Sequence, residues 1–262
     1  MAKCMRAIAL AVIFSLPQLF IFAQLPEDDS WDDLKLLRSK GTLIFHDSFD
    51  REESGNLSKA IGNGWNSATA DRVPDKKQAD LDQGILKIDS APEANHAAHI
   101  HHEAGFKDGG VLIRFKFPGI GPKESLQIGF VDRETKGIHA GHLCYALLNT
   151  TPTIITIMDW KTGVMNLENR KKRDEALKAG KPIPEDLQAL FKSKQATFAW
   201  KPDREWHNLA LVVVENEMRV SMDGKAVGKF RSEGFAHPNK RWFSMLVASK
   251  VWVDDVKIWK LQ

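Results

Sequence analysis

The sequence predicts an all-β fold, a sandwich or jelly roll of short antiparallel strands. Short apolar or alternating runs recur along most of the chain, and turn-forming pairs such as Asp108-Gly109 separate them. Asp223-Gly224 lies between two such runs, as the turn of a β-hairpin does. Many short strands joined by polar turns are typical of sandwiches and jelly rolls.

The N-terminal segment, residues 1–23, has the features of an export signal. Lys3 and Arg6 give it a positive start, the run 7–22 is uncharged and almost wholly apolar, and a small residue follows for cleavage. A membrane anchor is the competing interpretation, but the run is shorter than the ~20 residues of a spanning helix, and Pro17 interrupts it. We therefore expect a secreted or periplasmic protein, without stable membrane insertion after cleavage.

The rest of the chain is expected to form a helical segment and one β domain. A helix is predicted within residues 24–41, where Ser30 can cap the chain and Gly41 can end it. The β-sandwich then spans 42–262, a length that suits one large β domain. Inside it, residues 166–192 have helical composition and predict an insert of two short helices.

The expected strands follow from local patterns. In the run 111–117, apolar residues alternate with Leu112, Arg114 and Lys116, so that one face is predicted to be buried. The strands are expected at residues 42–45, 84–88, 97–102, 111–117, 126–131, 142–148, 153–158, 206–214, 218–222, 225–230, 243–248 and 251–259.

Charge and cysteine content exclude several classes of function. Without Lys3 and Arg6 the chain has 35 basic and 34 acidic residues, so there is no electrostatic case for nucleic acid. Signal cleavage would leave Cys144 as a single cysteine, which cannot form an intramolecular disulfide. Its apolar run, 142–148, favours a small buried hydrophobe over a thiol nucleophile.

The candidate chemistry centres on the histidine-rich run 96–102. On a strand, alternation places His99 and His101 on one face and His102 on the other, and His142 follows later in the chain. Such imidazoles can act as a general base or, with a third ligand, hold a divalent metal. No HExxH or paired-cysteine motif supports a metal, and no other cofactor is expected. An ordinary polar sheet surface is the alternative.

Other candidates come from strands and turns around these histidines. If the strand 111–117 neighbours the histidine strand, Arg114 shares its polar surface. Trp65 and Trp160 lie near turns, where an indole can stack on a sugar ring, whereas Trp206 is interpreted as a core residue. The remaining candidates are Lys161 as a charge stabiliser, with Gln127 and Asp132 as substrate-binding residues. The Glu-x-Asp-x-x-Glu strand of family-16 glycoside hydrolases is absent, which argues against a two-carboxylate hydrolase of that family.

Several motifs in order carry a family resemblance. They are residues 43–50 followed by Gly64-Trp65, then 81–86, 161–164, 202–209 with 218–225, and 253–259. Together they resemble the concanavalin A-like jelly rolls and, within them, the 3-keto-disaccharide hydrolase domain of secreted bacterial proteins. This resemblance implies a carbohydrate partner and cleavage of glycosides oxidised at C3. There the keto group acidifies the C2 proton, so that a base and an enolate stabiliser can eliminate the glycosidic oxygen.

The resemblance has one departure. The family has a Glu-x-Gln pair on a central strand, where this chain has Leu143 and Tyr145. If the chemistry is retained, His101 or His142 is expected to be the base, and Arg114 or Lys161 the charge stabiliser. The histidines favour an enzyme, and the missing polar pair favours the alternative, a lectin-like or laminin G-like glycan-binding module. A structural envelope protein is a third interpretation.

Overall fold

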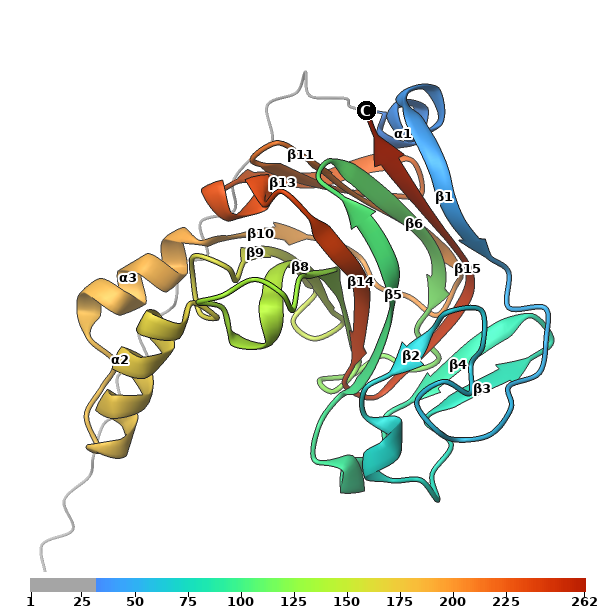
Figure 1. The fold of residues 1–262 in the computed structure, drawn as a ribbon, viewed down its shortest axis with the longest axis horizontal. Coiled ribbons are helices and arrows are strands. Elements are labelled where there is room, and N and C mark those ends of the chain that lie inside the picture. The colour runs from blue at the N-terminus through green and yellow to red at the C-terminus, as the bar shows by residue number, and fades with distance from the viewer. Residues whose placement is uncertain (1–31) are drawn as a thin grey trace, which may run out of the picture.

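The computed structural model describes residues 32–262, and two antiparallel sheets packed face to face form its body (Figure 1). The predicted sandwich is thereby confirmed, while the predicted signal peptide lies outside the described residues. The strands are β1 (Gly41–Asp47), β2 (Asn66–Ser67), β3 (Ala79–Asp82), β4 (Ile85–Asp89), β5 (Ala98–Phe106), β6 (Gly109–Lys116), β7 (Ser125–Val131), β8 (His142–Asn149), β9 (Ile154–Asp159), β10 (Gln195–Ala199), β11 (His207–Val214), β12 (Glu217–Met222), β13 (Lys225–Arg231), β14 (Lys240–Val247) and β15 (Lys250–Leu261).

Some strands that are consecutive in the sequence belong to different sheets. Sheet A has the order β13-β12-β11-β6-β15-β4-β3, with β1 also pairing with β15. Sheet B has the order β10-β9-β8-β7-β14-β5-β2. β5 therefore belongs to sheet B and β6 to sheet A. The prediction that Arg114 on β6 shares one surface with the histidines of β5 is wrong for this reason.

The core lies between the two sheets and contains one apolar face of each. Phe115 and Val256 of sheet A and Phe130 and Phe243 of sheet B are fully buried there. Burial of apolar surface contributes about 25 cal/mol per Å², so this interface is the main source of stability. Cys144 is part of the same cluster, and burial raises the pKa of its thiol to about 12. It behaves as the small core hydrophobe that its apolar run predicted.

Sheet A ends in a hairpin with a two-residue turn. β12 and β13 pair antiparallel, and Asp223 and Gly224 between them have φ angles of 50° and 76°. Both values lie in the left-handed region that a two-residue type I′ turn requires. The Asp-Gly pair therefore forms the hairpin turn that the sequence predicted.

The first helix, α1 (Asp33–Lys40), packs against sheet A. The side chain of Asp32 accepts a hydrogen bond of 2.8 Å from the backbone of Lys35, and the chain passes directly into β1 at Gly41. Asp32 thus provides the cap that the sequence assigned to Ser30, which lies outside the described residues. Leu37 packs on Trp259 of β15 and holds the helix on the sheet.

The predicted insert forms two helices, α2 (Leu167–Lys178) and α3 (Glu185–Ser193), at one end of the fold beside β9 and β10 (Figure 1). Asn166 caps α2 by accepting hydrogen bonds from two backbone N–H groups. Every residue of α2 is at least partly exposed, as its charged composition requires. No helix within residues 32–262 is long and apolar enough to cross a membrane.

Candidate functional site

The outer face of sheet B carries a row of residues that differs from an ordinary polar sheet surface. The strand register places five residues side by side, namely His101, Ser244, Gly129, Tyr145 and Met158. A Cβ at Gly129 would lie 2.6 Å from Cδ1 of Tyr145, so only glycine leaves room for the tyrosine ring. The row contains no carboxylate.

Hydrogen bonds link two members of this row, Ser244 and Tyr145, each to a histidine outside it. His99 Nε2 lies 2.7 Å from Ser244 Oγ, and His142 Nδ1 lies 2.6 Å from the hydroxyl of Tyr145. Ser244 and Tyr145 are separated in the register row only by Gly129, and Ser244 is close enough to lower the pKa of the Tyr145 hydroxyl against the larger raising effect of burial. We call these four residues, His99, Ser244, Tyr145 and His142, the relay. Tyr145 is fully buried at its centre.

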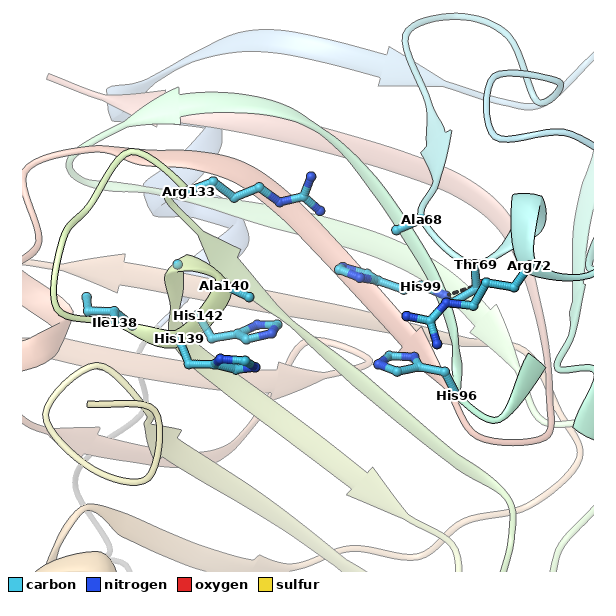
Figure 2. Close-up of a pocket in the computed structure, with 11 residues that line it drawn as sticks. Ala68, Thr69, Arg72, His96, His99, Arg133, Ile138, His139, Ala140 and His142 are labelled. Atoms are coloured by element: carbon cyan, nitrogen blue, oxygen red, sulfur yellow. Dashed lines mark hydrogen bonds between the residues drawn. The ribbon is translucent and has the colours of Figure 1, made fainter. Parts of the chain in front are cut away.

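Both ends of the relay line one pocket of about 430 Å³ (Figure 2). His99 is nearly buried, whereas four exposed side chains contribute to the lining. They are Arg72, His96, Arg133 and His139. Figure 2 shows His139 and His142 pointing across the pocket toward His96. No acidic side chain is among the lining residues.

Backbone hydrogen bonds fix the loop between β7 and β8 that carries one wall of the pocket. The N–H of Asp132 donates to the carbonyl of Gly141 at 2.9 Å, which closes the loop at its base. The N–H of His139 donates to Met165 at 2.8 Å, and Leu167 at the start of α2 donates to Gly137 at 2.9 Å. The helical insert therefore holds this wall in place.

Burial makes the imidazoles of the site weak bases. It lowers the pKa of His99 to about 3, and the neighbouring His101 and His142 add to the effect. Burial and nearby charges, with His139 first among them, lower the pKa of His142 to about 4. Burial and the charge of Arg133 lower the pKa of His101 to about 4 as well. All three rings are therefore neutral at pH 7.

These buried imidazoles predict that the fold loses stability as the pH falls below about 6.5. Histidines of the unfolded chain take up protons near that pH, whereas His99 and His142 stay neutral in the folded protein down to about 3 and 4. The unfolded state binds more protons in this window, so each such histidine costs on the order of 1 kcal/mol per pH unit of acidification. Urea unfolding curves between about pH 7 and pH 4 measure this slope. His99→Gln should flatten it, and a slope equal to that of the parent protein would contradict the prediction.

The structure brings some of the predicted site residues together. His99 and His101 share the outer face of sheet B, as strand alternation predicted, and His102 turns away to stack on Phe45 at 3.6 Å between ring centroids. The rings of His99 and His142 lie 6.4 Å apart. Two candidates thus meet from distant parts of the chain.

Trp160 and Gln127 also belong to the surroundings of the relay. Trp160 packs on Tyr145 at 4.7 Å and on His142 at 5.5 Å between ring centroids. Gln127 lies in the register row that also contains Leu246 and His99, and its buried Nε2 has no hydrogen-bond partner within residues 32–262.

Arg114 and Trp65, two of the predicted site residues, lie away from the pocket. Arg114 pairs with Asp254 on sheet A, and it lies 4.8 Å from the ring of Trp206, which is half-exposed rather than part of the core. Trp65 is buried with only 1% of its surface exposed, so it offers no platform for a sugar.

Asp132 and Lys161 lie outside the pocket lining. Asp132 is buried; burial alone would raise its pKa, but hydrogen bonds from His237 and Arg241 lower it to about 2. The charge of Lys161 acts on His237, Lys240 and Cys144, which are not pocket residues. Neither side chain is placed to contact a ligand in the pocket.

The sequence did not identify Arg72, Arg133 or Ser244 as site residues. Ser244 reaches the relay through the pairing of β14 with β5 and β7, which has no local sequence signal. Arg72 ends a short 3₁₀ turn and Arg133 lies in the loop after β7, and the approach of these two segments depends on the whole fold. As for metal binding, residues 32–262 contain no group of three or more histidine, cysteine or acidic side chains placed to hold an ion.

Comparisons with known proteins define the fold. No protein-family model and no curated protein matches the sequence. The structure is similar to the laminarinase from Rhodothermus marinus, with 14% identity over 85% of this chain and 98% of that one and a TM-score of 0.55. The laminarinase catalytic domain from Thermotoga maritima gives 13% identity over 85% and 99% and a TM-score of 0.54. SCLam, a non-specific endo-β-1,3(4)-glucanase from family GH16, gives 13% over 86% and 92% and a TM-score of 0.54. At such low identity the likeness concerns architecture alone. The chain has the concanavalin A-like jelly-roll fold.

Proposed function

We propose that the protein is exported and acts on a carbohydrate in this pocket, by removing a proton next to a carbonyl group of the sugar. The observation that carries the proposal is the relay, because its two terminal imidazoles, His99 and His142, line the same pocket. The jelly-roll fold is shared with glucanases, which raises the expectation of a glycan ligand. The absence of acidic side chains in the pocket disfavours a two-carboxylate mechanism.

The relay can move a proton between two sides of the pocket. A hydroxyl both donates and accepts a hydrogen bond, so a proton can pass through Tyr145 and Ser244 once their two hydroxyls bond to each other. When Nε2 of His142 takes a proton, its Nδ1 proton passes to Tyr145, that of Tyr145 to Ser244, and that of Ser244 to His99. A base at one end and an acid at the other are the two groups that an elimination needs.

Glycosides oxidised at C3, which the sequence resemblance implies, suit this arrangement. The C2–H bond breaks and its proton goes to His142, while its electron pair forms an enolate with the C3 carbonyl. The enolate then collapses to a C1=C2 double bond, and the C1–O bond breaks with its electron pair on the leaving oxygen. His99 supplies the proton that this oxygen takes up. Arg133 is close enough to lower the pKa of both histidines, and its positive charge stabilises the negative charge of the enolate.

A glycan-binding module without catalysis is the second candidate. The aromatic residue beside the relay favours this candidate, because Trp160 packs against the fully buried Tyr145. Trp160 is partly exposed and offers a surface on which a sugar ring can stack. In this case the histidines would bind sugar hydroxyls and transfer no proton.

Hydrogen exchange at C2 separates the two candidates. The protein is incubated in D₂O with a disaccharide oxidised at C3, and proton NMR follows loss of the C2 signal while a reducing-sugar assay follows cleavage. Exchange and cleavage well above the protein-free rate are expected. Saturable binding of oligosaccharides without exchange would establish the binding module instead, and the lack of both would contradict a carbohydrate function.

A further inference from the structure

Arg133 presents a guanidinium group without an internal partner to the pocket. It is exposed, and it makes no hydrogen bond or ion pair with any other residue of the described segment. Its two acidic neighbours in the sequence are both bound by Arg241, which lies 3.1 Å from Asp132 Oδ1 and 2.6 Å from Glu134 Oε2. The charge of Arg133 is therefore left for a ligand.

Arg72 supplies a second cation from another part of the lining. It ends the short 3₁₀ turn Ala70–Arg72, and its hydrogen bond to the carbonyl of Ala94 is long, at 3.5 Å. Figure 2 shows its side chain beside His96 within the group of lining residues. No carboxylate of the described residues pairs with it. Two guanidinium groups thus face one pocket that lacks an acidic side chain.

This lining fits an acceptor-only ligand better than a neutral sugar. The hydroxyls of a neutral sugar donate as well as accept, and carboxylates are the strongest acceptors that a protein can offer them. A guanidinium group has five donors and no acceptor, and its planar fork matches a carboxylate or a sulfate group. The lining of the pocket contains two such donors, Arg72 and Arg133, and no acidic acceptor.

Positive charge continues beyond the pocket along α2. The charges of Arg170 and Arg173 act on His139 at the rim, where, after burial, they lower its pKa. Arg173 is paired with Asp174, whereas the hydrogen bond of Arg170 is a weak one to the sulfur of Met165. A ligand with charges on successive sugars would therefore meet a favourable surface outside the pocket as well.

We propose that the pocket binds an acidic saccharide, with a carboxylate or sulfate group of the sugar held between Arg133 and Arg72. This inference rests on the proposed carbohydrate function and adds the class of its ligand. It concerns binding, and a binding measurement therefore tests it separately from catalysis.

Calorimetric titration with three matched probes tests the proposal. The probes are tetragalacturonate, its fully methyl-esterified form and a sulfated galactan tetramer. We expect measurable binding of tetragalacturonate or of the sulfated tetramer and at least tenfold weaker binding of the neutral ester. Arg133→Gln and Arg72→Gln should each weaken binding of the acidic probe by about tenfold or more, which corresponds to about 1.4 kcal/mol. The probe that binds more tightly identifies carboxylate or sulfate as the group recognised.

The matched control is Arg38→Gln, because Arg38 is an exposed arginine on α1, which packs on sheet A. Its affinity should stay within about twofold of the parent protein, as is usual for a remote surface charge. Equal binding of the acid and its ester, or unchanged affinity in the Arg133 variant, would overturn the proposal. Binding of the acid without C2 exchange would support the acidic subsite and contradict the proposed elimination. Exchange with no preference for acidic sugars would support the elimination and contradict the acidic subsite.

Discussion

Replacement of Trp65 by alanine is expected to lower the free energy of unfolding by about 3–5 kcal/mol. The ring is buried between Phe45 and Phe49, at 5.7 and 5.8 Å between centroids. Its Nε1–H donates to Asp47 at 2.8 Å, and Arg51 binds the same carboxylate through two hydrogen bonds. The substitution therefore creates a cavity and leaves a buried carboxylate with one donor fewer. Urea unfolding followed by circular dichroism measures the loss.

Trp160→Ala is the matched control for this prediction. Trp160 is partly exposed and packs only on the outer face of sheet B, so its loss should cost about 1–2 kcal/mol. Trp65→Phe should fall between the two, since it keeps most of the ring but removes the donor to Asp47. Equal losses for the two alanine variants would mean that Trp65 is not the core residue that its burial indicates.

The fold was largely predictable because its signals are local. Strand alternation and turn-forming pairs are properties of neighbouring residues, and the strands of the sandwich follow from them. The Gly64-Trp65 pair of the family resemblance also has a physical basis. Gly64 has a φ of 80°, and a Cβ there would lie 2.7 Å from Nε2 of His102. Glycine is therefore required directly before the buried tryptophan.

The site was predictable only where it too depends on local pattern. Alternation placed His99 and His101 on one face, because a strand has a period of two residues. The sequence cannot show which sheet a strand joins. The assumption that β5 and β6 are neighbours in one sheet wrongly placed Arg114 beside the histidines. A β-bulge between Phe130 and Val131 also shifts the register in which β7 pairs with β8.

Long-range pairing and loop packing determine the remainder of the site. Arg72 and Arg133 line one pocket only because the turn before β3 and the loop after β7 both lie beside it. Trp65 was misjudged for a related reason. Its position near a turn suggested exposure, whereas the turn is covered by β1 and by the side chain of His102.

His142→Ala is expected to lower the rate of C2 exchange in a 3-keto glycoside by about 10²–10⁴-fold, the usual contribution of a general base. The imidazole is held through its Nδ1 by Tyr145 at 2.6 Å, which leaves Nε2 for the substrate. Alanine removes the proton acceptor and leaves the cationic part of the pocket unchanged. Initial rates of deuterium incorporation, measured at saturating substrate, give the change in kcat directly.

His139→Ala is the matched control, since His139 lines the same pocket three residues away but makes no hydrogen bond to the relay. Its exchange rate should fall by less than about tenfold, because it removes no general base. Tyr145→Phe tests the relay itself: His142 can still accept the C2 proton, but the path to His99 through Ser244 is broken. Exchange should persist in this variant while cleavage falls, because the leaving oxygen no longer receives its proton. A His142→Ala protein that folds normally and exchanges C2 at the parent rate would exclude this histidine as the base, and parallel loss of exchange and cleavage in Tyr145→Phe would assign the tyrosine a role in orienting His142 alone.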